Sequence, residues 1–113
     1  NNYRYIRYAD VLLMAAEANN RGGISDSKAQ TYLNQVRSRA GVSSINETGS
    51  ALTQAIWDER RLEFAGEGQR FFDLVRTGQA PNEISGFVAG KHEVFPIPQT
   101  EIDISGLTQN AGY

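Results

Sequence analysis

The chain has 113 residues, a formal net charge of −2, 40% hydrophobic and 21% charged residues, and no cysteine. This length leaves room for one domain with a modest core, and the composition is ordinary for a globular protein. The small negative charge gives no reason to expect nucleic acid or an anionic membrane surface as a partner. The lack of cysteine excludes disulfides and thiolate metal sites, and no apolar run reaches the roughly 20 residues that span a bilayer.

Residues 5–20 predict a first helix. Ala, Leu and Met are strong helix formers, and apolar side chains at positions 5, 8, 9, 12, 13 and 16 form one wide stripe. The segment 21–23 (RGG) is a helix stop signal. A second helix is expected over residues 27–40, with Ser25 or Asp26 as its N-cap.

The connection between these two helices is short. Helices joined in this way run antiparallel, and the pair has the length of a tetratricopeptide-type hairpin. Because a single hairpin cannot bury both of its faces, further elements are expected to pack on it.

The remaining chain predicts two more helices and then a loss of periodicity. A polar loop over residues 42–50 precedes a third helix over 50–65, and a short fourth helix covers 69–76. From residue 79 onward Pro and Gly punctuate the sequence, which favours an extended tail that wraps the helices. Within it we expect at most a short strand near 93–95 and one helical turn near 99–102. The predicted fold is mainly α: a tetratricopeptide-like helical hairpin plus two further helices, with a long irregular C-terminal tail.

The most highly charged stretch is DERRLEFAGEGQRFFDLVRTG, residues 58–78. In it Glu59 and Glu63 continue an apolar stripe that begins with Leu52 and Ile56. A partly buried column of carboxylates requires cations from elsewhere in the fold. The planar fork of arginine satisfies both oxygens of a carboxylate better than lysine does. The available arginines are Arg4, Arg7, Arg37, Arg39, Arg70 and Arg76.

The carboxylate column has two possible roles, catalytic and structural. A pair of carboxylates is the machinery of acid/base catalysis and of glycoside hydrolysis. Such a pair needs an open cleft and pKa values that differ from each other, whereas these carboxylates lie among apolar anchors and many arginines. We therefore favour a structural Arg–carboxylate network that locks the first, third and fourth helices together. Its predicted members are Arg7, Arg37, Glu59, Arg60, Glu63, Arg70 and Asp73.

Other chemistry-bearing residues give weaker signals. His92 is the only histidine and has no partner at ligand spacing, so no metal site is predicted. The segments GEG and GFVAG lack the pattern of a phosphate loop. In the tail, Phe87 and Phe95 are favoured as packing anchors. We therefore predict no catalytic residue and no cofactor, and the ligand-binding residues stay unassigned, with His92 and Phe87 as candidates.

Five segments occur in an order that resembles a known family. They are IRYADVLLMAAEA (6–18), YLNQVRSRAGV (32–42), IWDERRLEFAGEGQRFFDLVRTG (56–78), FPIPQTEI (95–102) and LTQNAGY (107–113). Together they resemble the C-terminal domain of the SusD/RagB family, and the resemblance covers essentially the whole chain.

The resemblance implies a function that composition does not. Members of this family are nutrient-binding surface lipoproteins of the Gram-negative outer membrane, anchored through an N-terminal lipidated cysteine. They bind polysaccharides, oligosaccharides or other nutrients and pair with a SusC-like TonB-dependent transporter. They are mostly α-helical and are not enzymes. For this chain the resemblance therefore implies non-catalytic nutrient binding, with membrane association only through a lipid anchor upstream.

The resemblance also implies that residues 1–113 are a fragment, because family members have several hundred residues. The family's glycan-contacting loops come largely from upstream, so no binding residue is carried over. The matching residues are interpreted as scaffold: Arg7, Asp10, Glu17, Arg37, Arg39, Glu59, Arg60, Glu63, Phe64, Glu67, Gly68, Arg70, Asp73 and Arg76. Two alternatives stay open, namely a helical-repeat protein-interaction module without a ligand of its own and an acid/base hydrolase.

Overall fold

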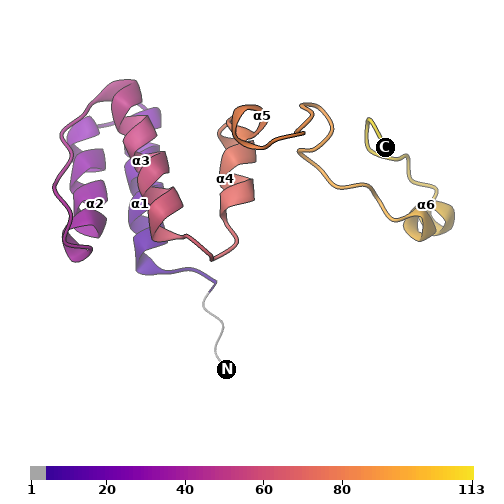
Figure 1. Cartoon of the computed structure of the whole chain (residues 1–113), viewed down its shortest axis with the longest axis horizontal. Coiled ribbons are helices and arrows are strands. Elements are labelled where there is room, and N and C mark those ends of the chain that lie inside the picture. The colour runs from indigo at the N-terminus through magenta and orange to yellow at the C-terminus, as the bar shows by residue number, and fades with distance from the viewer. Residues whose placement is uncertain (1–4) are drawn as a thin grey trace. The chain divides into compact units, whose positions relative to one another are not determined.

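The computed structural model describes residues 5–113, and in that range it contains six helices and no strand (Figure 1). The helices are α1 (Tyr8–Arg21), α2 (Asp26–Arg39), α3 (Gly49–Glu63), α4 (Arg70–Arg76), α5 (Ala80–Glu83) and α6 (Gln99–Ser105). The predicted mainly α fold class is therefore confirmed. The chain divides into two compact units, Asn1–Gln69 and Arg70–Tyr113, and each is described by itself.

The first unit is built on the predicted hairpin of α1 and α2. The Ser25 side chain caps α2 by accepting a hydrogen bond from the Lys28 backbone N–H. At the end of α1, Gly23 has a φ of 65°, which only glycine adopts without strain. The start of α1 differs from the prediction, since the helix begins at Tyr8 rather than at residue 5. Arg7 instead has an extended backbone, and its side chain reaches the end of α3.

Helix α3 packs against the hairpin and completes the core of this unit, and Figure 1 shows α1, α2 and α3 side by side. The apolar stripes predicted for the three helices form the buried core. Leu13, Leu33, Leu52 and Ile56 are all fully buried. Burial of a side chain of this size stabilises a fold by about 1.5–3 kcal/mol, so these four leucine and isoleucine side chains hold the three helices together.

Helix α3 ends at Glu63, two residues earlier than predicted, because Phe64 leaves the helical conformation with φ −107° and ψ 19°. The Phe64 side chain is buried, and the guanidinium carbons of Arg7 and Arg60 lie 4.9 and 5.1 Å from its ring centroid. The end of α3 is thus fixed by a ring that contacts two arginines.

In the second unit, α4 and α5 pack on each other with Leu74 and Ala80 buried. The sequence interpretation missed α5, a four-residue helix with Pro near its start. The helical turn expected near 99–102 is confirmed and extends to Ser105 as α6. That the tail wraps the helices stays a prediction.

The strand expected near 93–95 is wrong. The backbone carbonyls of Val94 and Phe95 accept hydrogen bonds from the side chains of Tyr113 and Asn110. The Val94 N–H donates to the Lys91 carbonyl in a turn. Because side chains and a local turn satisfy these groups, residues 93–95 do not pair with another strand.

Candidate functional site

The carboxylate column on α3 is bound by arginines along its length. Glu59 is only 5% exposed, and its Oε2 lies 2.5 Å from Nη1 of Arg37 on α2. The same guanidinium donates through Nε to the Ser43 carbonyl at 2.7 Å. Arg37 therefore joins the end of α2 and the loop that follows it to α3.

Glu63 is engaged through both carboxylate oxygens. Its Oε1 accepts from Arg7 Nη1 at 2.7 Å, and its Oε2 accepts from Nη2 of Arg39. Arg7 also donates to Glu67 through Nε at 3.0 Å and Nη2 at 2.7 Å, a bidentate pair. These hydrogen bonds hold the pKa of the Glu67 carboxyl below its ordinary value and raise the pKa of Arg7. The Arg7–Glu67 contact therefore favours the charged form of both partners.

Arg60 and Asp10 form a second, deeper ion pair. Nη1 of Arg60 lies 2.7 Å from Oδ1 of Asp10, and both residues are buried. Nη2 of Arg60 donates to the Gln69 side-chain carbonyl at 3.1 Å. This pair fastens α1 to α3 on the buried side of the helix.

The structure thus brings five of the seven predicted network residues together in the first unit: Arg7, Arg37, Glu59, Arg60 and Glu63. The other two make ion pairs inside the second unit, where Arg70 lies 3.6 Å from Glu83 and Asp73 pairs with Arg76. Helix α2 supplies the predicted member Arg37 and also Arg39, which pairs with Glu63. Arg4 lies outside the described residues.

An acid/base pair needs carboxylates that face a cleft. Glu59 and Glu63 face arginines instead, and both side chains are less than one tenth exposed. Across residues 5–113, no group of three or more Asp, Glu or His side chains is placed to hold a metal ion. In the same range, no helix is both long enough and apolar enough to cross a membrane.

A polar cluster at the opposite end of the helices was missed from the sequence. Asn20, buried at the end of α1, donates through Nδ2 to Asp26 at 2.7 Å and to the Gly49 carbonyl at 3.1 Å. Thr53 donates to Asn20, and the Gly49 N–H donates to Asp26 at 2.7 Å. Asp26 therefore caps α3 from α2, while Thr48, the N-cap residue, makes no side-chain cap. The only sign of this cluster in the sequence was an Asn, an Asp and a Thr near three predicted helix ends.

We expect this cluster to make stability depend on pH. The Asn20 amide and then the Gly49 N–H lower the pKa of Asp26 below its ordinary value. A lowered pKa contributes stability that is present above the unfolded value, about 3.9, and is lost as pH falls through the folded value. The destabilisation caused by Asp26→Asn, measured by urea unfolding, should be constant above about pH 5 and shrink below about pH 4. A destabilisation that stays the same from pH 7 to pH 2 would contradict this assignment.

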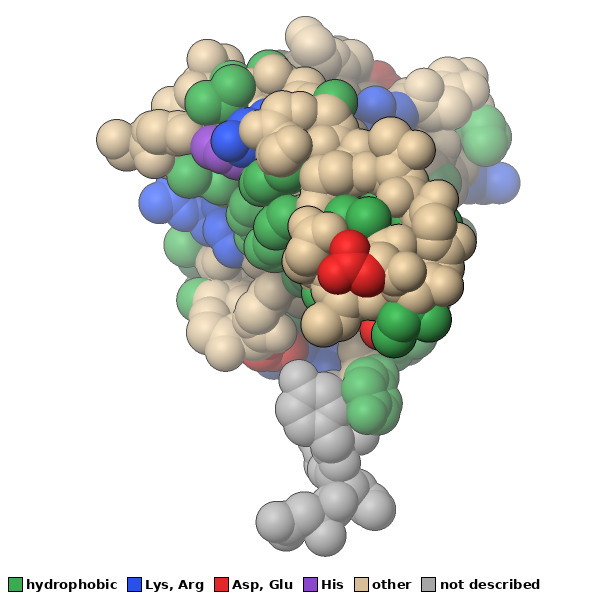
Figure 2. Space-filling view, turned by 90° about the vertical axis from the view of Figure 1, so that its right-hand side faces the viewer, with side chains coloured by type: hydrophobic (Ala, Val, Ile, Leu, Met, Phe, Trp, Pro, Cys, Tyr) green, Lys and Arg blue, Asp and Glu red, His purple; other side chains and the backbone are tan. Residues whose placement is uncertain are grey.

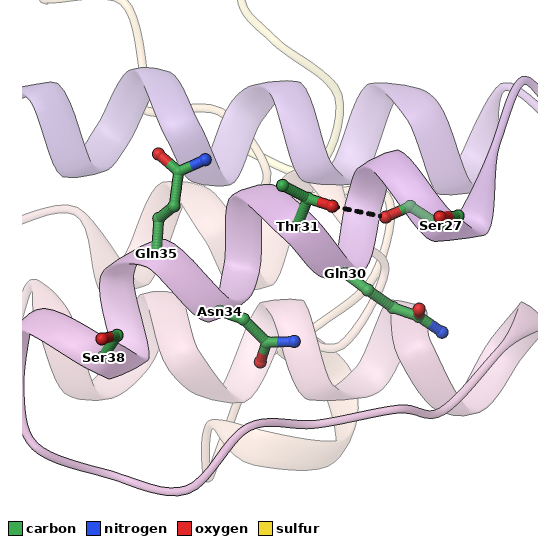
Figure 3. Close-up of a pocket in the computed structure, with 6 residues that line it drawn as sticks. All are labelled: Ser27, Gln30, Thr31, Asn34, Gln35 and Ser38. Carbon is green, nitrogen blue, oxygen red and sulfur yellow. Dashed lines mark hydrogen bonds between the residues drawn. The ribbon is translucent and has the colours of Figure 1, made fainter.

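A polar groove of about 530 Å³ lies along α2, lined by Ser27, Gln30, Thr31, Asn34, Gln35 and Ser38. Gln30 and Asn34 point toward the loop beside the helix (Figure 3). Asn34 donates to the Ile45 carbonyl and accepts from the Ile45 N–H, and Gln30 donates to the carbonyls of Asn46 and Glu47. These amides hold the loop in place, so we interpret the groove as structural.

The second unit contains a smaller pocket of about 240 Å³ with an aromatic lining. Both candidates for ligand contact, Phe87 and His92, line it. The other lining residues are Phe71, Ile84, Ser85, Gly86, Val94, Phe95 and Tyr113. Figure 2 faces this unit and shows hydrophobic side chains beside the histidine on its surface.

Side-chain-to-backbone hydrogen bonds hold the walls of this pocket. Nδ1 of His92 accepts from the Val88 N–H at 2.9 Å, which closes the loop between them. The Gln109 side chain binds both the N–H and the carbonyl of Ile97 at 2.8 and 2.9 Å. Tyr113 donates to the Val94 carbonyl at 2.9 Å. The chain after α6 is therefore tied back to residues 94–97.

A tetratricopeptide-like hairpin, an arginine-bound carboxylate column and an irregular tail together define a mainly α protein. The model of the SusD family (SusD/RagB) matches residues 1–94. The chain belongs to the SusD family, and the resemblance drawn from the five sequence segments is confirmed.

Two relatives come from Formosa agariphila. SusD-like protein P2 is 33% identical, in a match that covers 99% of this chain and 26% of that protein. SusD-like protein P38 is 36% identical, with 99% and 25% covered. The chain therefore spans about a quarter of the length of these relatives.

Solved structures give the same result. A SusD homolog from Bacteroides thetaiotaomicron has a TM-score of 0.84 and 37% identity over 94% of this chain and 24% of that one. Surface glycan-binding protein A from Bacteroides uniformis has a TM-score of 0.78 and 40% identity over 98% of this chain and 28% of that one.

Proposed function

We propose that this chain is the C-terminal domain of a longer, non-catalytic surface protein that binds a polysaccharide, an oligosaccharide or another nutrient. In this proposal the protein delivers its ligand to a SusC-like TonB-dependent transporter. An upstream lipid anchor holds it on the cell outer membrane. The observation that carries the proposal is the 40% identity, over 98% of this chain, to a solved protein named as a surface glycan-binding protein.

The contacts of the carboxylates argue against hydrolysis. A glycosidase needs one carboxylic acid with a raised pKa and one free carboxylate. In the α3 column, Glu59 and Glu63 are bound as ion pairs by two arginines of α2 and by Arg7, which precedes α1. Neither carboxylate is free to act as an acid or a base, because a guanidinium binds each of them. We propose that the network is the scaffold that closes the helical hairpin.

We expect the pure protein to bind a glycan on a glycan array without cleaving it. Incubation of the bound glycan with the protein should release no new reducing ends, because the column holds no free acid/base pair. Release of reducing ends that Glu59→Gln or Glu63→Gln abolishes would refute the non-catalytic proposal and restore the hydrolase interpretation. Exposed Glu101, on α6, provides the matched control as Glu101→Gln.

The second candidate function is a helical-repeat protein-interaction module without a ligand of its own. The observation in its favour is the outer side of α1, where Tyr8, Val11 and Met14 are 72%, 46% and 47% exposed. Exposed apolar residues at this spacing form one helix face that is suited to a partner. Titration calorimetry with a SusC-like transporter, taken together with the glycan array, separates the two functions. Binding to a transporter without binding to any glycan on the array would favour the interaction module.

A further inference from the structure

We propose that the aromatic pocket of the second unit binds one uncharged sugar ring. This inference rests on the proposed function and adds the place and the chemistry of a binding site. Three features of the pocket carry it: its size, its uncharged lining and a hydrogen-bond donor whose direction is fixed. None of them involves the arginine–carboxylate network of the first unit.

The size of the pocket sets the size of the ligand. At about 240 Å³ it lies below the range of about 300–1,000 Å³ found for sites that enclose drug-sized molecules. A single ring, either at the end of a glycan chain or as a side branch, is the largest unit of a polysaccharide that such a volume encloses.

The lining favours a ring that has an apolar face and no charge. The residues around the pocket include Phe71, Phe87, Phe95 and Tyr113, and none of the lining residues is Asp, Glu, Lys or Arg. Phe95 packs against Phe71 with ring centroids 6.1 Å apart, yet it is 73% exposed. Covering an exposed ring with the C–H face of a sugar removes apolar surface from water on both molecules. An acidic sugar would gain no cation from these residues.

His92 supplies a donor of known direction. Its Nδ1 accepts the Val88 N–H, so in the neutral ring the proton resides on Nε2. The ring is further held by an edge contact with Phe87, at a centroid distance of 5.7 Å. Nε2–H is therefore available to donate to a sugar hydroxyl. The lining residue Ser85 adds a hydroxyl that both donates and accepts.

The pocket walls are formed before a ligand arrives. The hydrogen bonds of Gln109 to Ile97, of Asn110 to the Phe95 carbonyl and of Tyr113 to the Val94 carbonyl fix the backbone beneath the exposed ring. Lys91 lies 4.7 Å from the centroid of the Tyr113 ring and holds that ring in place. A pre-organised site loses little conformational entropy on binding, which suits recognition of one small ring.

The test compares two exposed phenylalanines that both contact Phe71. Phe95 lines the pocket, whereas Phe72 is 65% exposed, lies 5.8 Å from Phe71 and is not part of the lining. The methyl glycosides of glucose, galactose, mannose and xylose are titrated into ¹⁵N-labelled protein and followed by NMR. At least one glycoside should shift the amide signals of residues 84–95. Phe95→Ala should weaken its binding by about tenfold or more, and Phe72→Ala should leave it within twofold.

A second variant tests the donor. His92→Asn keeps an acceptor close to the position of Nδ1 and removes Nε2–H, so binding should weaken by about three- to tenfold while the signals of residue 88 stay near their wild-type positions. The inference is overturned if no glycoside shifts these signals, or if Phe95→Ala and Phe72→Ala weaken binding equally. If the protein still binds glycans on the array in that case, the proposed function stands and only the pocket assignment fails. If no glycan binds at all, both the proposed function and the pocket assignment are wrong.

Discussion

Replacing Arg60 by alanine is expected to lower the free energy of unfolding by about 3–5 kcal/mol, the cost of breaking a buried ion pair by removing one partner. The change leaves the Asp10 carboxylate buried without the guanidinium that lies 2.7 Å from it. It also removes a hydrogen bond to Gln69 and a cation–π contact with the Phe64 ring. Urea unfolding of the chain, followed by far-UV circular dichroism, measures the loss.

The neighbouring residue provides the control. Arg61 has the same side chain on the same helix but is exposed, so Arg61→Ala should change stability by less than about 0.5 kcal/mol. The double variant Asp10→Leu with Arg60→Met replaces both charges by apolar side chains, and it should recover much of the loss. A loss under about 1 kcal/mol in Arg60→Ala would show that water reaches Asp10 and that the pair is not desolvated.

The apolar pattern predicted most of the first unit. Leu33 and Val36 on α2, and Leu52 and Ile56 on α3, recur at helical spacing, and all four are buried. The same spacing placed Glu59 and Glu63 on the buried stripe of α3. Periodicity works here because one face of each helix meets one core.

The long-range polar contacts were not predictable in the same way. Asp10 and Arg60 are separated by 50 positions in sequence, and nothing in the local pattern of α1 distinguishes Asp10 from a solvent-facing carboxylate. The cluster around Asn20 is similar, because each of its residues looks like an ordinary helix-end residue. Pairings of this kind depend on how the helices cross, and the crossing geometry leaves no periodic pattern in a single sequence.

The tail was hardest to predict. It lacks periodicity, and its backbone is held by the side chains of Gln109, Asn110 and Tyr113 acting on residues 94–97. A short run such as Glu93–Val94–Phe95 has the composition of a strand, but strand formation needs a neighbouring backbone. Here amide and hydroxyl side chains fill that role. The aromatic pocket results from these contacts, which is why only Phe87 and His92 could be proposed as candidates in advance.

Truncating the carboxylate column has the second largest expected effect. Glu63→Ala should cost about 2–4 kcal/mol because it leaves Arg7 and Arg39 without their shared partner at the end of α3. Glu59→Ala should cost a similar amount by leaving Arg37 without its ion-pair partner. In Glu63→Ala, Arg7 keeps its bidentate contact with Glu67, so Arg7 loses only part of its ion pairing. Urea unfolding at pH 7 measures both variants.

The control for these two variants is Glu101→Ala, because Glu101 is an exposed glutamate in the first turn of α6. Its loss should stay under about 0.5 kcal/mol. Salt supplies a second criterion, since exposed ion pairs are screened and buried ones much less so. The cost of Glu59→Ala should therefore be nearly the same at low and high salt. The cost of the corresponding change at the exposed Glu67, Glu67→Ala, should shrink as salt is added. A cost below about 0.5 kcal/mol for both Glu59→Ala and Glu63→Ala would show that solvent, and not the arginines, stabilises the column.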